Sequence, residues 1–435
     1  MTTSSRARQD APHVVIVGGG FAGLSALAKA TRAGLHVTLI DRHPYTTFQP
    51  LLYQVATGGL NPGDITYSLR RLASNHGAAF RQGQVSWIDP EAKTVFLDQG
   101  DEISYDKLIL TAGVGPNYFG VTGAPEHTHS IYTRARALAT RDAIFSGLEQ
   151  LTQAGDPERR FTVAVVGGGA TGVELAGSLA ELKSEALPTI YPELATDNFR
   201  VVLIEMSDRL LAPFQYRQRL YTLRQLRKRG VDVRLRTSVA AVSPHHIEFG
   251  DGSSLDADVV VWASGVGAHR AVREWGMPLG RGGRIQVDPT LKVIGQDHIY
   301  AAGDCCICED APLPQLASPA QQMGRHAVDQ IVAELRGQSP QRFEYKDKGI
   351  MATIGRGAAV VELSQGPTFR GYPAWAAWVG LHLVTLLGGR NRLQTMVNMA
   401  FRFFEWPASA ATIVGDMVAP TKRSRRTGKP ADPAK

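Results

Sequence analysis

Two glycine-rich segments of this chain have the residue types and spacing that hold the pyrophosphate of a dinucleotide. Gly18-Gly19-Gly20-Phe21-Ala22-Gly23 follows the apolar run 13–17, and Gly167-Gly168-Gly169-Ala170-Thr171-Gly172 follows the run 161–166. Glycines let the backbone approach a phosphate, and the N-terminus of the next helix stabilises its negative charge. One such segment is typical of many strand-to-helix turns, but two in the same context predict two bound dinucleotides.

Each glycine segment is followed by an acidic residue at the end of the next apolar run, where a ribose hydroxyl would bind. Asp41 lies 23 positions and Glu205 lies 38 positions after the first glycine of its segment. The longer spacing predicts an extended helix end and a loop inserted over 183–198, a segment that contains two prolines. Glu205 also favours NADH over NADPH, because a carboxylate repels a 2′-phosphate, whereas the nearby Arg209 weakens that preference.

Three short motifs that follow other apolar runs are expected to complete the two sites. Gly303-Asp304 offers a carboxylate to the ribityl hydroxyls of a flavin and a glycine where the backbone approaches the phosphate. Thr111-Ala112-Gly113 and Ala263-Ser264-Gly265 mark the points where the chain passes between domains. This order predicts an N-terminal FAD site that is completed far downstream, with a nested NADH site that hands a hydride to the flavin.

Short apolar strands that alternate with crossover helices position these motifs. The fold class is therefore α/β, with two Rossmann-like dinucleotide-binding domains, the NADH domain inserted in the FAD domain, and C-terminal amphipathic membrane-anchoring helices. The length of 435 residues, with 43% apolar residues and 45 glycines, suits two or three domains. The expected parts are a disordered N-terminus (1–12), the FAD-binding domain (13–125 and 281–345), the NADH-binding domain (126–280), the membrane-anchoring region (346–415) and a basic disordered tail (416–435).

The positive charge of the chain is concentrated at its C-terminal end. From residue 346 on there are 13 Lys and Arg against 5 Asp and Glu, whereas the preceding residues carry 34 against 35. Because no nucleic-acid-binding fold accompanies this basic end, we expect no nucleic-acid partner and an attraction to anionic lipid instead.

The same end contains the most apolar segment, 372–387, which carries no formal charge. At about 1.5 Å per residue it is shorter than the ~30 Å core of a bilayer. The next segment, 393–404, has an amphipathic pattern, so we expect monotopic attachment to a membrane, with a buried helix of a homodimer as the alternative. The residues of the types found at the headgroup level are Arg390, Arg392, Arg402, Trp375, Trp378 and Trp406.

The N-terminus and the cysteines give two smaller expectations. Residues 1–12 are polar and lack the apolar core of a secretory signal, so we expect the protein at the cytoplasmic face of the cell membrane. The three cysteines, Cys305, Cys306 and Cys308, directly follow Gly303-Asp304. Adjacent cysteines make poor disulfides and the spacing does not suit a metal site, so we expect no metal and small buried side chains, with a redox disulfide as the alternative.

Four segments resemble the type II NADH dehydrogenases, the single-subunit NADH:quinone oxidoreductases of the two-dinucleotide-binding flavoprotein superfamily. They are FQPLLYQVAT at 48–57, GGGATGVELAG at 167–177, MATIGR at 351–356 and GRNRL at 389–393. The resemblance covers nearly the whole chain. It implies tightly bound FAD, NADH as the donor and a membrane quinone, menaquinone or ubiquinone, as the acceptor, with no proton pumping.

The motifs and the resemblance together give the expected cofactor-binding residues. For FAD they are Gly18, Gly20, Phe21, Ala22, Gly23, Asp41, Arg42, Gln54, Val85, Thr111, Ala112, Gly113, Gly303, Asp304 and Ala317. For NADH they are Gly167, Gly169, Ala170, Thr171, Gly172, Glu174, Glu205, Ser264 and Gly265.

The residues expected at the reaction centre are Glu174, Ser318, Gln321, Gln322 and Lys348. Glu174 lies near the start of a helix, where the helix dipole favours a carboxylate; the resemblance implies a role in hydride transfer, and helix capping is the alternative. The quinone pattern of the family is Ala-Gln-x-Ala-x-Gln-x-Gly. Here Ser318 replaces its first glutamine, Gln322 matches its second, and Gln321 is an additional amide, which leaves the identity of the quinone open.

The function predicted from these features is transfer of a hydride from NADH to FAD, followed by transfer of two electrons to a membrane quinone. Two alternatives remain open. A soluble NAD(P)H-dependent flavoprotein reductase with another acceptor would share both glycine segments. An NADH-responsive flavoprotein sensor would bind the same cofactors and turn over slowly.

Overall fold

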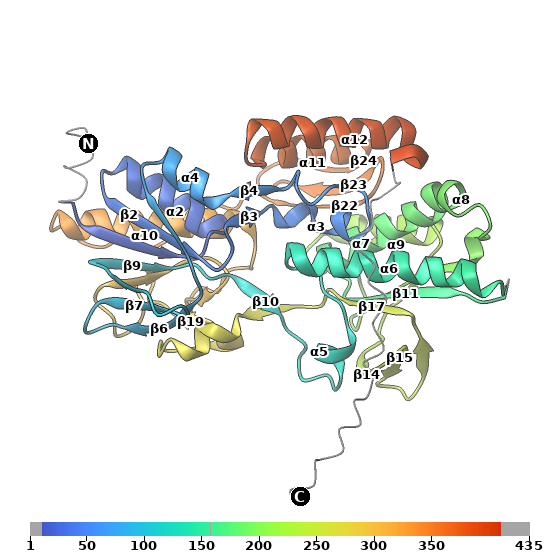
Figure 1. Cartoon of the computed structure of the whole chain (residues 1–435), viewed down its shortest axis with the longest axis horizontal. Helices are drawn as coiled ribbons and strands as arrows, with labels where there is room; N and C mark the ends of the chain where they lie inside the picture. The colour runs from blue at the N-terminus through green and yellow to red at the C-terminus, as the bar shows by residue number, and fades with distance from the viewer. Residues whose placement is uncertain (1–10, 157, 410–435) are drawn as a thin grey trace, which may run out of the picture.

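The computed structural model describes residues 11–156 and 158–409, and from 402 on only the backbone (Figure 1). The tail expected to be disordered over 416–435, and all but the last two residues of the N-terminal segment 1–12, lie outside the described residues. The described chain forms two parallel sheets, each with covering layers, and a C-terminal sheet that carries two helices.

The first parallel sheet is built from segments far apart in the sequence. Its strand order is β20-β9-β1-β2-β5, with every neighbouring pair parallel. The strands are β1 (His13–Val17), β2 (His36–Asp41), β5 (Ala79–Gln82), β9 (Lys107–Leu110) and β20 (Ile299–Ala301). Since β20 pairs with β9, the downstream segment completes the N-terminal domain, as the sequence predicted.

Both faces of this sheet are covered. Helices α2 (Phe21–Arg32) and α10 (Ala317–Leu335) pack together on one face, with α4 (Leu69–Asn75) beside them. A small antiparallel sheet covers the other face, and it consists of β6 (Val85–Asp89), β7 (Thr94–Leu97) and β8 (Glu102–Ser104). Coverage on both faces explains why β1 is a continuous apolar run rather than an alternating one.

The second parallel sheet belongs to the inserted domain and has the order β13-β12-β11-β17. Its strands are β11 (Phe161–Val166), β12 (Phe199–Ile204), β13 (Val231–Arg234) and β17 (Val259–Trp262). One face of the sheet is covered by the helices α6 (Arg134–Ala154), α7 (Ala170–Glu181) and α9 (Tyr216–Lys228). The opposite face is covered by the antiparallel strands β14 (Val239–Ser243), β15 (His246–Phe249) and β16 (Ser254–Asp256). The insertion predicted over 183–198 is confirmed, because α7 continues into a π-helical turn and α8 (Leu187–Ile190) before β12.

The chain crosses between the two domains on a pair of antiparallel strands, β10 (Val114–Pro116) and β18 (Val266–Ala268). Both crossings come earlier in the sequence than the boundaries expected at 125 and 280. Packing explains the difference. The segment before residue 133, including α5 (Ala124–His127), joins the inserted domain, where His129 N donates to Val260 O at 2.8 Å. After β18 the chain is back on the first domain, where Trp275 Nε1 donates to Val85 O at 3.0 Å.

A long excursion links the first domain to the helices of the second. It contains β3 (Tyr45–Thr47), α3 (Leu52–Ala56) and β4 (Thr66–Ser68), and α3 packs against α6 and α7. The strands β19 (Ile285–Gln286) and β21 (Cys306–Ile307) form a short parallel pair beside the first domain.

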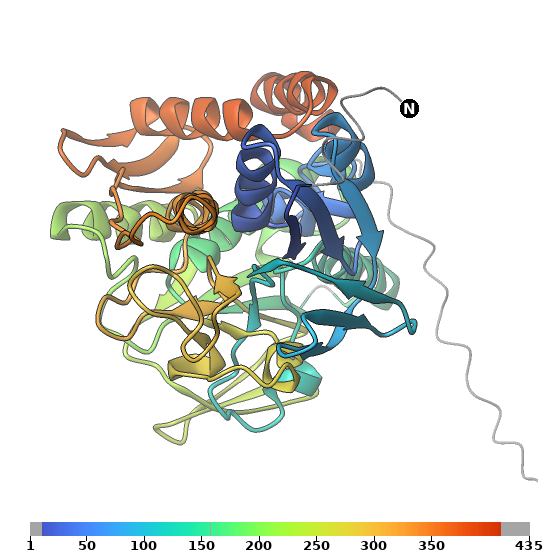
Figure 2. The same ribbon diagram turned by 90° about the vertical axis from the view of Figure 1, so that its left-hand side faces the viewer.

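The C-terminal part is a three-stranded antiparallel sheet followed by two helices. The elements are β22 (Ile350–Gly355), β23 (Ala358–Glu362), β24 (Thr368–Gly371), α11 (Tyr372–Thr385) and α12 (Gly389–Ser409). Figure 1 and Figure 2 both show α11 and α12, in red, along the same side of the molecule. Within the described residues, no helix combines the length and the apolar character needed to cross a bilayer.

Two helical glycines allow backbones to touch at the joins between these parts. A Cβ atom at Gly324 of α10 would meet Ala22 O of α2 at 2.2 Å. A Cβ atom at Gly177 of α7 would meet Ile354 O of β22 at 2.1 Å. These two contacts bring α10 onto the first glycine segment and the C-terminal sheet onto the helix that follows the second.

We expect Gly324→Ala to lower the free energy of unfolding by about 1–3 kcal/mol, because α10 must move away from α2 to admit the methyl group. Chemical denaturation followed by circular dichroism measures this change. Gly380→Ala is the matched control, since a Cβ atom at Gly380 of α11 meets nothing within 4 Å and the change only removes the cost of a helical glycine. Equal stability of the two variants would contradict the proposed backbone contact.

Candidate active site

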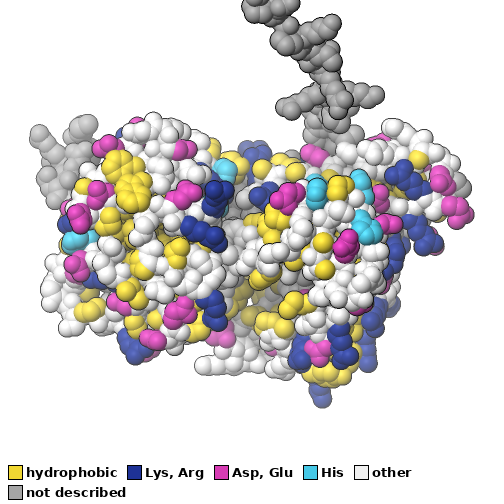
Figure 3. Space-filling view, turned by 90° about the horizontal axis from the view of Figure 1, so that it is seen from below, with side chains coloured by type: hydrophobic (Ala, Val, Ile, Leu, Met, Phe, Trp, Pro, Cys, Tyr) yellow, Lys and Arg dark blue, Asp and Glu magenta, His cyan; other side chains and the backbone are white. Residues whose placement is uncertain are grey.

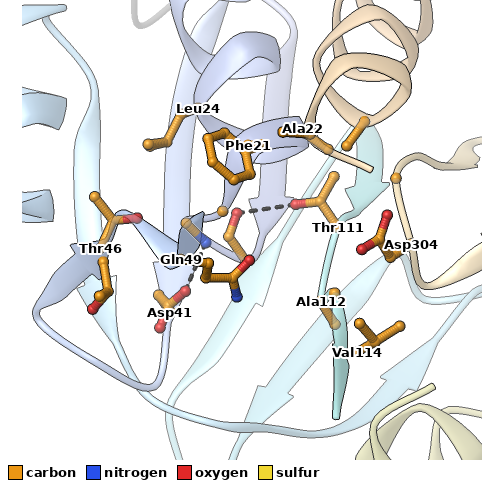
Figure 4. A pocket seen from close by; sticks show the side chains of 18 of the residues that line it. Phe21, Ala22, Leu24, Asp41, Thr46, Gln49, Thr111, Ala112, Val114 and Asp304 are labelled. Atoms are coloured by element: carbon orange, nitrogen blue, oxygen red, sulfur yellow. Dashed lines mark hydrogen bonds between the residues drawn. The ribbon is translucent and has the colours of Figure 1, made fainter. Parts of the chain in front are cut away.

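One cavity of about 1310 Å³ runs between the two domains and is lined by residues of both glycine segments. Figure 4 shows its first-domain side, with the side chains of Phe21, Asp41, Thr111 and Asp304 arranged around the space at the end of β1. On the face shown in Figure 3, a groove separates two lobes, and Lys and Arg side chains gather along it. Positive charge near such a cavity suits ligands that carry phosphates.

The first glycine segment needs glycine for reasons of space and of conformation. Gly18 has φ +109°, and a Cβ atom there would meet Thr111 O at 2.3 Å. A Cβ atom at Gly23 would meet Gly18 O at 1.9 Å. Thr111 Oγ1 donates to Val17 O at 2.8 Å and to Gly18 O at 2.9 Å, which ties the segment to the end of β9 (Figure 4).

The second glycine segment repeats this geometry. Gly167 has φ +116°, and a Cβ atom at this position would meet Ala263 O at 2.8 Å. A Cβ atom at Gly172 would meet Gly167 O at 1.8 Å. The two turns therefore leave the first N–H groups of α2 and α7 exposed toward the cavity, where they can hold a pyrophosphate.

The two acidic residues also occupy equivalent places. Asp41 accepts hydrogen bonds from Gly19 N at 2.6 Å and His43 N at 2.8 Å, and burial raises its pKa. Glu205 accepts from Gly168 N at 2.6 Å and Ser207 N at 2.7 Å. Each carboxylate is thus held against its glycine loop, which is where the ribose of a bound dinucleotide lies.

Most of the residues predicted for the flavin site line the large cavity. Those that line it are Gly18, Gly20, Phe21, Ala22, Asp41, Arg42, Val85, Thr111, Ala112, Gly113, Gly303, Asp304 and Ala317. Gly23 lies behind the loop, and Gln54 lines a different cavity. Of the residues predicted for NADH, Gly169, Ala170, Thr171, Glu174 and Gly265 line the large cavity, whereas Gly167, Gly172, Glu205 and Ser264 do not.

Asp304 follows β20 and lies on the floor of the cavity. Burial raises the pKa of this carboxyl to about 6, although the positive charge of Arg284 opposes that rise.

The neighbouring Cys305 and Cys306 are buried and form no disulfide, and Cys305 Sγ contacts Leu110 O at 3.4 Å. Burial raises the pKa of the Cys305 thiol to about 11, so this thiol is inert at neutral pH.

Glu174 is the most strongly perturbed carboxyl in the site. It lies in the second turn of α7, and its half-buried side chain opens into cavities rather than onto the outer surface. Burial raises its pKa to about 8, although hydrogen bonds from Thr353 N–H and the side chain of Trp378 oppose that rise. Glu174 therefore holds a proton at neutral pH and can act as an acid.

Trp378 was expected at the headgroup level, and this expectation is wrong. Its side chain is 2% exposed, because it faces the protein from α11 and donates to Glu174. His382, one turn further on, stacks on Trp378 with ring centroids 3.9 Å apart, and burial lowers its pKa to about 4. Trp375 of the same helix is half-buried, and the side chains of Arg402 and Trp406 lie outside the described part of the chain.

The segment expected to bind a quinone lies at the start of α10. Gln321 lines the large cavity. Gln322 instead bonds the backbone of Lys346, donating from Nε2 to its O at 2.9 Å and accepting from its N at 3.0 Å; it also donates to Ser318 Oγ at 3.2 Å. Lys348 is exposed, on the segment that leads into β22. The structure therefore brings Gln321 to the cavity and keeps Ser318, Gln322 and Lys348 outside its lining.

A second cavity, of about 50 Å³, lies beside the large one between α3, α7, β22 and α11. The residues that line it include Tyr53, Gln54, Glu174, Ser178, Glu181, Thr353, Arg356 and Trp378. No motif in the sequence predicts this cavity. Only the spacing of Glu174, Ser178 and Glu181 along one face of a helix could have indicated a polar stripe there.

Comparison with known proteins identifies the family. Residues 12–324 match the family described as pyridine nucleotide-disulphide oxidoreductase. Over 420 residues the chain is 34% identical to the type II NADH:quinone oxidoreductase Ndh of Mycobacterium tuberculosis, covering 92% of this chain and 90% of the relative. This chain belongs to the type II NADH:quinone oxidoreductases. It is also 29% identical to the type II NADH:quinone oxidoreductase of Haemophilus influenzae, covering 85% of this chain and 92% of that one.

The solved structure of NDH2 from Plasmodium falciparum in complex with NADH has the same fold as this type II oxidoreductase. The TM-score is 0.82 at 20% identity, and the alignment covers 91% of this chain and 98% of that chain. The first-domain site of this type II oxidoreductase fits FAD. A Cβ atom would fill the cradle at Gly18, and the buried carboxyl of Asp304 lines the same cavity.

Glu174→Gln is expected to flatten the dependence of stability on pH. The folded protein keeps the Glu174 proton up to about pH 8, whereas the unfolded chain releases it near 4.5, so stability falls as pH rises between these values. The slope is about 1.4 kcal/mol for each pH unit. Denaturation of the holoenzyme at several pH values in this window measures it. Glu91→Gln, at an exposed position, keeps the wild-type slope, and equal slopes for wild type and Glu174→Gln would refute the assignment.

Proposed function

We propose that this chain oxidises NADH and reduces a quinone, so that NADH, a proton and a quinone give NAD⁺ and a quinol. The observation that carries this conclusion is the single cavity lined by both glycine segments and by Glu174. Two dinucleotides bound at its two ends would bring their reactive rings together near the middle, where a bimolecular hydride transfer becomes effectively unimolecular. The family to which the chain belongs supports the same reaction.

The residues divide into two binding sets and an acid. Gly169, Ala170 and Thr171 hold the NADH pyrophosphate at the N-terminus of α7. FAD, when bound along Gly18–Gly23, Asp41 and Asp304, supplies the ring that accepts a hydride and passes two electrons on. Glu174, which is protonated at neutral pH, is placed to donate a proton in the cavity.

Gln321 is the best candidate for contact with a quinone. It lines the large cavity, whereas both polar atoms of the Gln322 amide are engaged by Lys346. An amide N–H donor suits a quinone carbonyl. The additional glutamine therefore takes the place that the family pattern gives to its second glutamine.

The alternatives are not favoured. A reductase with a redox disulfide needs accessible thiols, but Cys305 and Cys306 are buried and Cys308 is half-buried. A slow NADH-responsive sensor has no support from the relatives, which are named as oxidoreductases. NADH is the expected donor because Glu205, held by Gly168 N, is the residue proposed to bind the ribose, and Arg209 is paired with the carboxylate of Asp208.

Anaerobic mixing of the FAD-loaded protein with NADH is expected to bleach the flavin absorbance, and a short-chain quinone is expected to restore it. NADPH serves as the matched donor, and we expect it to react with a kcat/KM at least about ten-fold lower because of Glu205. Bleaching by NADH without reoxidation by any quinone would show that the acceptor is another compound. A higher kcat/KM with NADPH would refute the role of Glu205.

The helices α11 and α12 are the proposed membrane-binding surface. Their outward residues are apolar, with Val384 70%, Leu393 59% and Phe401 55% exposed. Arg390 is also exposed there, and the chain from residue 346 on has an excess of basic residues. An apolar face with basic residues beside it suits the interface of an anionic membrane, and a homodimer across the same face is the alternative. Attachment at the cytoplasmic face stays a prediction.

The double variant Val384→Glu/Leu393→Glu is expected to lose most of its binding to vesicles that contain anionic lipid, because two charges would enter the apolar layer. Vesicle flotation measures this. Ile294→Glu, at a position 51% exposed on the first domain, is the matched control and should bind like wild type. If the double variant still floats, the surface is wrongly assigned. If wild type fails to float and is a dimer that the double variant dissociates, the face is a dimer interface.

A further inference from the structure

One exposed aromatic residue beside the large cavity has a backbone conformation that its residue type disfavours. Phe119 follows β10, where the chain enters the inserted domain (Figure 1). Its φ of +51° lies in the left-handed region, which glycine tolerates and a bulky aromatic residue rarely adopts. Its side chain is 64% exposed. Single exposed apolar residues are common on proteins, but one that is also held in a disfavoured conformation points to a function.

The turn that carries Phe119 is fixed to the end of β17. Asn117 Oδ1 accepts a hydrogen bond from Phe119 N at 3.0 Å, and Asn117 O accepts one from Trp262 Nε1 at 2.8 Å. Asn117 N also donates to Gly265 O at 3.3 Å. The ring of Tyr118 packs against that of Trp262 with centroids 5.6 Å apart. These contacts hold the turn, whereas the Phe119 side chain gains little burial, so folding alone does not require an aromatic residue at this position.

The ring of Phe119 lies over Gly265, a glycine that lines the large cavity. A Cβ atom at Gly265 would meet Phe119 Cζ at 2.3 Å, and Gly265 itself has φ +74°. The lack of a side chain at Gly265 therefore lets the ring reach the cavity wall. Because Phe119 does not line the cavity and is largely exposed, its ring forms the rim where the wall meets solvent.

Gly265 lies next to the second glycine segment, which holds the pyrophosphate of NADH under the proposed function. Strand β17 pairs with β11, and a Cβ atom at Gly167 would meet the Cα atom of Ser264 at 2.8 Å. Strand β12, which leads to the proposed ribose residue Glu205, is the other neighbour of β11. The ends of β12 and β17 are therefore roughly 10 Å apart, across two strand spacings. An adenosine whose ribose is bound at Glu205 can extend across this distance toward Gly265.

The exposure of Phe119 decides which end of NADH the ring meets. The nicotinamide ring must reach the part of the cavity near Glu174, and Phe119 does not line that space. The adenine ring is at the opposite end of the dinucleotide, beyond the pyrophosphate. A largely exposed ring at the rim therefore fits the adenine, which is the end of NADH that takes no part in hydride transfer.

We infer that Phe119 is a binding residue for NADH, whose ring stacks on the adenine at the outer end of the dinucleotide site. This inference rests on the proposed function, because it takes NADH as the donor, and deepens it by assigning a residue to the end of the substrate that does not react. Stacking on an aromatic side chain holds a base through its π-face. The fixed turn sets the direction in which the Phe119 ring leaves the backbone, and the strain of that turn is the kind that binding sites retain.

Calorimetric titration of the FAD-loaded protein with AMP tests this contact without turnover, because FAD fills the first site and AMP carries only the adenosine half of NADH. We expect Phe119→Ala to weaken AMP binding at least about ten-fold, which is typical for removal of a ring that stacks on a base. Phe119→Trp keeps an aromatic face and should bind AMP nearly as wild type does. Trp87→Ala, at an aromatic position 49% exposed on the first domain, is the matched control and should bind AMP like wild type.

Two donors locate the effect within the substrate. With NADH, the KM of Phe119→Ala should rise at least about ten-fold at an unchanged kcat, because the lost contact is the same in the ground state and the transition state. Reduced nicotinamide mononucleotide lacks the adenosine half, so wild type and Phe119→Ala should oxidise it with equal kcat/KM. An equal loss of kcat/KM with both donors would overturn the inference.

Stability separates binding from a structural role. Glycine suits the left-handed backbone, so Phe119→Gly should lose AMP affinity as Phe119→Ala does, while the midpoint of thermal unfolding does not fall. Lys93→Gly is the matched control, since Lys93 has the same φ of +51°, and this variant should bind AMP like wild type. Wild-type AMP affinity in Phe119→Gly, or a midpoint below that of wild type, would assign the ring to folding and overturn the inference.

The AMP titration also separates this inference from the proposed function. If Phe119→Ala weakens AMP binding in a protein that reduces no quinone with NADH, the role of Phe119 stands and the proposed function is refuted. If Phe119→Ala binds AMP like wild type in a protein that does reduce quinone with NADH, the proposed function stands and the role of Phe119 is refuted.

Discussion

The packing of three separate parts of the chain around one carboxyl group is the constraint on which the site depends. Glu174 lies on α7 of the inserted domain. Its carboxyl group accepts one hydrogen bond from β22 and a second from α11. This arrangement requires β22 to touch the helix backbone, which is possible because Gly177 has no side chain in the way of Ile354 O. Moving any of the three parts would lessen the burial that raises the pKa of this carboxyl.

That constraint explains why α11 cannot be only a surface helix. Its outward side carries exposed apolar residues such as Val384, while its inward side carries Trp378 and His382. The ring of His382 stacks on Trp378, and its Nδ1 lies 2.7 Å from Trp378 O, which holds the indole in place. Burial lowers the pKa of His382 to about 4 and keeps the ring neutral, although the hydrogen bond to Trp378 O opposes that shift. The same helix therefore serves the outer surface with one face and the acid of the site with the other.

Features that depend on local backbone geometry could be predicted from the sequence. Gly18 and Gly167 need positive φ and close approach to a neighbouring strand, so their role follows from residue type and context. The insertion of one domain in the other could also be predicted, because the Gly303-Asp304 motif indicated that the chain returns to the first sheet after the second domain. The expected domain boundaries were less accurate, since short segments such as 117–133 join whichever domain offers them hydrogen bonds and apolar contacts.

Features that depend on which way a helix faces could not be predicted. Tryptophan is a residue type that suits a membrane surface, but packing turns the Trp378 side chain into the protein. Glutamine suits a quinone carbonyl, but the Gln322 side chain is hydrogen-bonded to the backbone of Lys346.

The nested topology also sets the order in which the protein can be assembled during synthesis. The inserted domain closes its sheet within about one hundred residues of chain, from β11 to β17, and these contacts are available as soon as that stretch has left the ribosome. The first domain must wait, because β9 is paired on one side by β20, and α10 reaches α2 only after nearly three hundred intervening residues have been made. During that interval the N-terminal half carries an unpaired strand edge and an uncovered apolar helix face, so the nascent chain depends on rapid completion or on a chaperone before it can retain a flavin.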